Sequence, residues 1–307
     1  MLAPVSEAKE VPTFSAFAEE FMSTYAAANN KPSERSTKSI ILKHHLLPAF
    51  GELRCDQIRM HAVEAMKAEK LAASLSHKRV NNILACLGKI LRYAHETEVI
   101  ASVPKIKLLK LPVQKFDFLT FEEFERLLAA VKENSERHAL FLLAGETGLR
   151  QGEMIALEWE DVDFVAKTLT VRRSVWREIV GTPKGGRERK IPLTVRLAAA
   201  LKAHRHLRGE RVFYQADGSS FTPSAVEAAL RFACKRAGLR RIGSHVLRHT
   251  FCSHLAMRGA PPKAIQELAG HSTLAMTLRY MHLAPIALRE AIELLNSGQL
   301  MGNAAEA

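Results

Sequence analysis

The feature that most constrains the fold of this chain is a basic segment at residues 103–118. It contains Pro104 and Pro112, four lysines and a single acidic residue, Asp117. Prolines interrupt regular secondary structure and clustered like charges repel one another, so this segment is predicted to be an extended linker. The chain of 307 residues is therefore expected to form two domains, each large enough to bury a core.

Before the linker, apolar residues recur with the period of an α-helix. Helices are predicted from Phe14, over about 35–46, over about 60–73 and from Ser76 onward, with Thr13 as a candidate cap of the first helix. Residues 1–12 are expected to be disordered, and residues 13–102 are expected to form a domain of helices with short connections.

After the linker the pattern is mixed. Helical periodicity extends to about residue 158, opened by a capping box of Thr120 and Glu123, and it resumes at about Val195. Strands are predicted at 168–171, around 174–180 and at 187–193. A turn with Pro183 and two glycines precedes the last strand, so Lys184 is expected at the tip of a β-hairpin. The fold class is therefore mostly α with a small antiparallel β-sheet (α+β), with a second domain over 119–284 and a tail over 285–307.

Composition narrows the class of partner and compartment. The formal net charge is +12, with 17 Lys and Arg against 11 Asp and Glu in residues 1–115 and 27 against 21 in the rest. Excess positive charge in both parts favours a polyanionic partner gripped from two sides. The four cysteines form no C-x-x-C pair, which is typical of reduced thiols. With no signal peptide and no apolar run of about 18 residues, an intracellular protein without a membrane segment is expected.

The second half carries the residues on which chemistry depends. Six side chains stand in distinctive local strings: Arg150 after Thr147-Gly148-Leu149, Lys184 in its glycine turn, His245 and Arg248 in one helix, His271 after Gly270, and Tyr280 before His282. Arginine stays charged and binds two phosphate oxygens at once. The set is therefore suited to attack on a phosphodiester, with Tyr280 as nucleophile, His245 as its base and Lys184 as the acid for the leaving oxygen. Two roles stay open for His271: a hydrogen bond to the phosphate, or help in moving a proton.

In kind, order and spacing these six residues resemble the tyrosine recombinase (phage integrase) family, and the resemblance runs through the catalytic half. The resemblance implies a site-specific recombinase that forms a covalent 3′-phosphotyrosine and needs neither metal nor cofactor. It also implies the same roles for the same six residues. It also implies double-stranded DNA with an inverted-repeat core site, a monomer in solution that assembles into a homotetramer on synapsed DNA, and a place in the bacterial cytoplasm at the nucleoid.

The helical part resembles the core-binding domain of the same family. Its second and fourth predicted helices carry polar residues suited to a phosphate backbone or a base edge. These candidates are Arg35, Lys38, Lys43, Lys78, Arg79, Asn82, Lys89 and Arg92. The tail contains an amphipathic pattern from Ile286 onward, and two positions stay open for it: packing on its own catalytic domain, or docking on a neighbouring copy, which the family pattern favours.

Other readings compete with recombination. A type IB topoisomerase uses similar chemistry, and a DNA-binding regulator without catalysis has a similar charge. The acidic string Glu158, Glu160, Asp161 and Asp163 suggests a two-metal site, but acids at a helix-to-strand turn commonly cap or face solvent. His245, His249 and His254 suggest zinc, yet the H-E-x-x-H pattern is missing and Arg248 lies among them.

Overall fold

A computed structural model describes residues 10–112, 116–177, 179–183, 185–215 and 217–284 of the chain. The chain divides into two compact units, Met1–Gln114 and Lys115–Ala307, and the boundary falls inside the predicted linker. Each unit has its own hydrophobic core. None of the described helices is both long and apolar enough to cross a membrane.

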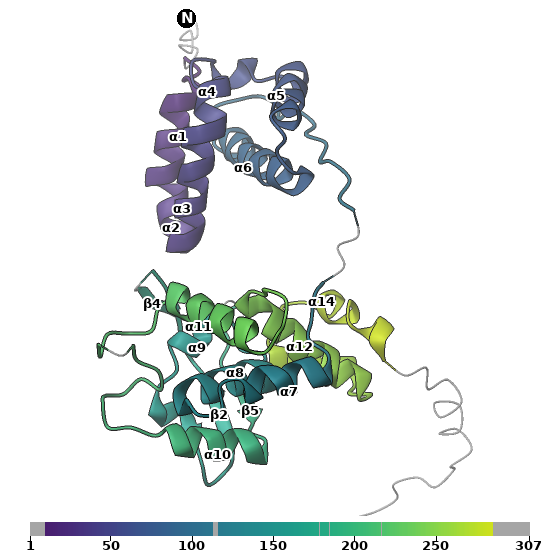
Figure 1. Ribbon diagram of the computed structural model, residues 1–307. Coiled ribbons are helices and arrows are strands. Elements are labelled where there is room, and N and C mark those ends of the chain that lie inside the picture. Colours follow the sequence, from purple (N-terminus) through teal and green to yellow (C-terminus); the bar gives the residue numbers. More distant parts are fainter. Residues whose placement is uncertain (1–9, 113–115, 178, 184, 216, 285–307) are drawn as a thin grey trace, which may run out of the picture. The chain divides into compact units, whose positions relative to one another are not determined.

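The first unit is helical, as predicted (Figure 1). Its elements are α1 (Phe14–Ser23), α2 (Tyr25–Asn29), α3 (Pro32–Ile41), a π-helical turn (Leu42–Leu46), α4 (Leu47–Phe50), a 3-10 turn (Cys55–Gln57), α5 (Met60–Ala72) and α6 (His77–Glu96). Thr13 caps α1 by accepting a hydrogen bond from the Ala16 amide, which confirms the predicted helix start. The apolar stripe of α6, from Val80 to Ala94, is buried in the core of this unit.

Residues 103–112 lie along the first unit. Val103, Ile106 and Leu109 pack against its core. The Asn81 side chain, which is 8% exposed, donates to the Leu109 carbonyl and accepts from the Leu109 amide, both at 2.8 Å. An amide side chain satisfied on both sides fixes the backbone it pairs with, so this half of the predicted linker is anchored to α6.

The second unit combines helices with two small antiparallel sheets, which confirms the predicted fold class (Figure 1). Its helices are α7 (Phe121–Ala129), α8 (Ser135–Thr147), α9 (Gln151–Ile155), α10 (Val195–His204), α11 (Pro223–Arg236), α12 (Ser244–Met257), α13 (Pro262–Ala269) and α14 (Leu274–Leu278), with 3-10 turns at Trp159–Asp161 and Met281–Leu283. Its strands are β1 (Val162–Asp163), β2 (Thr168–Val171), β3 (Ser174–Trp176), β4 (Ile179–Gly181) and β5 (Arg189–Pro192). The predicted capping box opens α7.

Strand pairing differs from the predicted hairpin. The order β1-β2-β5 places Leu169 opposite Ile191, while β3 pairs with β4 in a separate two-stranded sheet. Ile191 and Leu169 are buried in the core, whereas Ile179 of β4 is half exposed, so burial draws β5 to β2. The predicted pairing of these two strands in one hairpin is wrong, because β4 and β5 belong to different sheets. Lys184, the predicted tip residue, lies outside the described residues.

Helix α8 is buried in the second unit and leads into the first predicted catalytic residue, Arg150. It packs against α10 and α12, and residues 139–145 are all buried. It ends at Gly148 in the left-handed conformation (φ 62°), where a β-carbon would lie 2.4 Å from Cδ1 of Phe251 on α12. Glycine is therefore required at this turn, which sends the chain directly into Arg150 and α9.

Candidate active site

Five of the six predicted catalytic residues lie within the described part of the chain, and four helix ends or faces supply them. Arg150 caps α9, His245 and Arg248 lie on α12, His271 follows the left-handed Gly270 that ends α13, and Tyr280 follows α14. Lys184 lies outside the described residues.

Arg150 is held by a buried carboxylate. Its Nη1 donates to Glu153 Oε1 at 2.9 Å, its amide donates to Glu153 Oε2 at 2.9 Å, and its Nη2 donates to the Gly270 carbonyl at 2.8 Å. Arg189 of β5 donates to the same carboxylate at 2.7 and 3.2 Å. The guanidinium of Arg150 is thereby fixed between α9 and the end of α13.

Glu153 is 1% exposed. Burial alone raises the pKa of its carboxyl, but the hydrogen bonds and charges of Arg189 and Arg150 outweigh burial and hold that pKa below its usual value. The carboxylate stays ionised and binds two arginines at once, so one negative charge is shared between two positive ones. This local excess of positive charge favours an anion.

Arg248 adds a second cation, and this one is buried. Its side chain donates to the Gly148 carbonyl at 2.6 Å, and the residue is 3% exposed. Burial, followed by the charge of Arg150, lowers the pKa of its guanidinium to about 10, so it remains charged at neutral pH. A buried charge without its own carboxylate is costly, and an anionic phosphate oxygen would relieve that cost.

The histidines of the set have different surroundings. His271 is buried, with Nδ1 2.8 Å from Thr277 Oγ1, and burial followed by the charges of Arg248 and Arg150 lowers its pKa to about 3. His245 is exposed, and its pKa is lowered by partial burial of its ring and then by the same two arginines. Both rings are therefore neutral at pH 7 and lie within the field of the arginine pair.

Tyr280 is 4% exposed. Its ring lies parallel to that of His271, with centroids 6.1 Å apart, and Phe116 packs against it at 4.7 Å. Burial holds the pKa of the phenol above its usual value. The hydroxyl lies 2.6 Å from Nδ1 of His249, so the predicted base, His245, is not the histidine that contacts it among the described residues.

Three residues of this site were not predicted from the sequence. Glu153 and Arg189 clamp Arg150, and His249 contacts Tyr280, the predicted nucleophile. Glu153 stands three residues after Arg150 in a capping-box pattern that a sequence can reveal. His249 was weighed only as a metal ligand, although its position next to Arg248 on one helix places it near the set.

The competing metal ligands have other partners. Arg173 Nη2 lies 2.7 to 2.9 Å from carboxylate oxygens of Glu158, Glu160 and Asp161. His254 lies 2.9 Å from the Leu119 carbonyl. Within the described residues, no group of three or more His, Cys, Asp or Glu side chains is arranged to hold a metal. Three residues of the acidic string therefore bind arginine, and the fourth, Asp163, accepts hydrogen bonds from the Val165 and Ala166 amides.

The predicted DNA-binding residues of the first unit lie on its surface. Arg35, Lys43, Lys78, Asn82 and Arg92 are exposed. Three others are half-buried: Lys38, Arg79, whose Nη2 lies 3.5 Å from His45, and Lys89, whose ammonium lies 4.4 Å from the centre of the Tyr25 ring.

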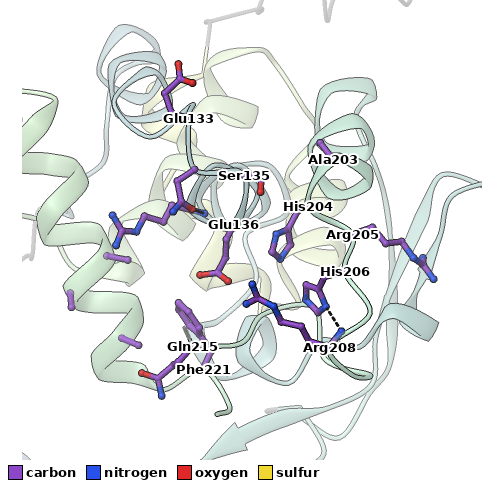
Figure 2. Close-up of a pocket in the computed structure, with 15 residues that line it drawn as sticks. Glu133, Ser135, Glu136, Ala203, His204, Arg205, His206, Arg208, Gln215 and Phe221 are labelled. Carbon is purple, nitrogen blue, oxygen red and sulfur yellow. Dashed lines mark hydrogen bonds between the residues drawn. The ribbon is translucent and has the colours of Figure 1, made fainter. Parts of the chain in front are cut away.

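Two hollows of the second unit differ in their distance from the predicted catalytic residues. One of about 490 Å³ opens beside His271 and is lined by Gly185, Arg187, Arg189, Lys263 and Gly270 among others. Another of about 850 Å³ lies at the start of α8, at the opposite end of that helix from Gly148. Figure 2 shows Glu136, His204 and Arg208 turned toward this second hollow. It contains none of the six predicted catalytic residues.

Comparison with known proteins places this geometry in a family. The model of the phage integrase family matches residues 117–286, more than half of the chain. The chain is 31% identical to a XerC-like tyrosine recombinase of Caldanaerobacter subterraneus over 73% of its length and 66% of that protein, just under two thirds. It is 27% identical to the ICEBs1 integrase of Bacillus subtilis over 87% of its length and 78% of that protein.

The fold agrees with these relatives. The structure of the Tn1549 transposon integrase in complex with transposon right-end DNA superposes with a TM-score of 0.80 at 21% identity. The match covers 93% of this chain and all of that one. At this identity the likeness establishes the fold, and the family rests on the sequence match.

Proposed function

Because the chain belongs to the phage integrase family of tyrosine recombinases, we propose that it is a site-specific DNA recombinase that cuts and rejoins DNA through Tyr280. The observation that carries this proposal is the convergence of Arg150, Arg248 and His271 around a single buried tyrosine. Two fixed guanidiniums bind the non-bridging oxygens of one phosphodiester, and the phenol oxygen attacks its phosphorus.

The proposed reaction proceeds in two balanced transfers. The phenolate of Tyr280 forms a bond to phosphorus and the bond to the 5′ oxygen breaks, leaving a 3′-phosphotyrosine. Lys184, which lies outside the described residues, supplies the proton to the 5′ oxygen. His245 and His271 hydrogen-bond the phosphate beside the arginines. In the second transfer a 5′ hydroxyl gives its proton to Lys184, its oxygen bonds to phosphorus, and the bond between phosphorus and the Tyr280 oxygen breaks. The energy of the first broken bond is kept in the phosphotyrosine, so this resealing needs no ATP.

Arginine and lysine supply the positive charge that the five-coordinate phosphorus requires. We therefore propose that cleavage needs no divalent metal or organic cofactor. The support is the arginine pair itself, which carries more positive charge than Glu153 neutralises.

We propose double-stranded DNA with an inverted-repeat core site as the substrate, bound by residues of both units. The exposed cations of the first unit support this, since phosphate contacts provide most of the affinity for DNA. A monomer in solution would assemble into a homotetramer on two synapsed sites in the bacterial cytoplasm, at the nucleoid. Residues 285–307 lie outside the described residues, and their docking on a neighbouring copy stays a prediction.

The test is a nicked suicide substrate carrying the core site, incubated with wild-type protein, with Tyr280→Phe and with Tyr214→Phe as a matched control from the same unit. Wild type and Tyr214→Phe are expected to give a covalent protein–DNA band on a denaturing gel. Tyr280→Phe is expected to bind the DNA and give none. A persistent band with Tyr280→Phe would assign the nucleophile elsewhere, and relaxation of plasmids without a core site would favour a topoisomerase.

A further inference from the structure

The proton of Tyr280 must leave before its oxygen can attack phosphorus, and the structure limits where that proton goes. The phenol is 4% exposed, so water has little access to it. Two described side chains hydrogen-bond the Tyr280 side chain: Nδ1 of His249, 2.6 Å from the hydroxyl oxygen, and the thiol of Cys252. Burial raises the pKa of the Cys252 thiol to about 11, so the thiol keeps its proton and His249 is the group that can accept one.

The His249 ring is fixed in this orientation. Phe116 stacks on one side, with ring centroids 5.4 Å apart and planes 28° apart, and His245 meets it edge-on at 4.7 Å. Phe116 contacts Tyr280 as well, so one aromatic side chain holds both members of the pair. A rigid donor–acceptor pair of this length suits proton transfer.

The other two histidines have different tasks. Nδ1 of His271 lies 2.8 Å from the Thr277 hydroxyl. His245 is exposed and lies in the field of Arg248 and Arg150. This places His245 on the phosphate side of the site and leaves His249 on the nucleophile side.

We propose that His249 is the base that takes the proton of Tyr280, an assignment that rests on the proposed function and deepens it. The O–H bond of Tyr280 breaks and its proton moves to Nδ1 of the neutral ring, which carries its own hydrogen on Nε2. The phenolate then attacks phosphorus, and the imidazolium that forms is balanced by the phosphodiester. On resealing, the phosphorus–phenol bond breaks and the proton returns to the phenol oxygen.

Burial by itself opposes this proton transfer, because it raises the pKa of the Tyr280 phenol and lowers the pKa of the His249 ring. Burial, followed by the charges of His245, Arg279 and Arg248, lowers the pKa of His249 to about 4, and Asp117 opposes them weakly. The ring is therefore neutral and able to accept a proton at pH 7. A bound phosphate brings a negative charge beside these cations and raises the basicity of the ring.

The test compares His249→Asn with wild type and with His282→Asn as a control. Asparagine places an oxygen near the position of Nδ1, so it preserves a hydrogen-bond acceptor and removes the base. Single-turnover cleavage of the suicide substrate is expected to fall about 100-fold or more with His249→Asn, the usual contribution of a general base. His282 is exposed and bonds the Arg279 carbonyl, so its variant is expected to cleave at the wild-type rate.

A second arm replaces Tyr280 with a fluorinated tyrosine of lower phenol pKa in both backgrounds. The fluorinated phenol loses its proton more readily, so it is expected to restore most of the lost rate in His249→Asn. Wild-type cleavage rates with His249→Asn, or no restoration by the fluorinated tyrosine, would overturn the assignment. Absence of any adduct with wild type would instead overturn the proposed function, which keeps the two failures distinct.

Discussion

The positively charged side chains of the two units differ in their ion-pair partners. Of the seven charged DNA-binding candidates in the first unit, none forms an ion pair within the part of the chain that the structure describes. In the second unit, Arg150, Arg189 and Arg173 all contact buried carboxylates. Unpaired surface charge is available for many phosphates, whereas paired charge is fixed in direction. In the proposed function, the first arrangement provides affinity for DNA and the second orients the side chains that bind one phosphodiester.

The largest effect is expected where the paired arrangement is broken. Glu153→Gln removes the negative charge shared by Arg150 and Arg189 and leaves two cations together in a buried place. The free energy of unfolding is expected to fall by roughly 3 kcal/mol. Cleavage by the folded protein is expected to fall by about 100-fold because Arg150 loses its orientation.

Urea denaturation and single-turnover cleavage measure these effects. Glu160→Gln is the control, since its side chain is 61% exposed although it also pairs with an arginine. A change of less than about 1 kcal/mol is expected for it. Equal stability and activity of the two variants would show that the buried clamp does not organise the site.

The same clamp predicts a dependence on pH. Because the pKa of Glu153 is lower in the folded than in the unfolded protein, its stabilising contribution is fully present above the unfolded pKa. It is lost as pH falls through the folded value. The stability difference between wild type and Glu153→Gln is therefore expected to be constant above about pH 5 and to narrow below about pH 4. A difference that grows on acidification would contradict the ionised carboxylate.

Smaller effects are expected where an unpaired charge of the first unit is removed. Arg92→Ala should weaken binding to the core site less than about 10-fold and lower the salt dependence of binding by about one phosphate contact. Cleavage at saturating protein should not change. Lys89→Ala, three residues earlier on α6, should change the salt dependence less, because its ammonium already lies over the Tyr25 ring. A larger change in salt dependence with Lys89→Ala than with Arg92→Ala would contradict this difference between the two side chains.

Local patterns predicted much of this fold. Thr13 and the pair Thr120 and Glu123 cap helices as expected, because capping depends on neighbours within one turn. The stripe of α6 is buried as its period predicts. Strand pairing was predicted less well, since β5 lies beside β2 and the intervening β3 and β4 pair with each other. Such a choice is decided by which side chains reach the core, and Ile191 reaches it through contacts distant in the sequence.

In the site, too, residues in local sequence patterns were predicted, and residues brought in by distant contacts were not. Four of the predicted site residues stand in distinctive local sequences: Arg150, Arg248, His271 and Tyr280. Two of these sequences contain a glycine in the left-handed conformation, Gly148 and Gly270. Arg189 and Phe116 carry no such string, and their contacts with Glu153 and Tyr280 arise only when distant segments meet. Supporting residues of this kind are visible only in the folded chain.

In the proposed reaction, one tyrosine that is activated without metal becomes joined to DNA. Its most direct test is to trap the covalent complex on a suicide substrate in the presence of a chelator, digest it with protease, and identify the modified peptide by mass spectrometry. The account predicts a single modified residue, Tyr280, joined to a 3′ phosphate, with the same yield with or without the chelator. A nucleotide on another residue, or an adduct that forms only when a divalent cation is added, would contradict it.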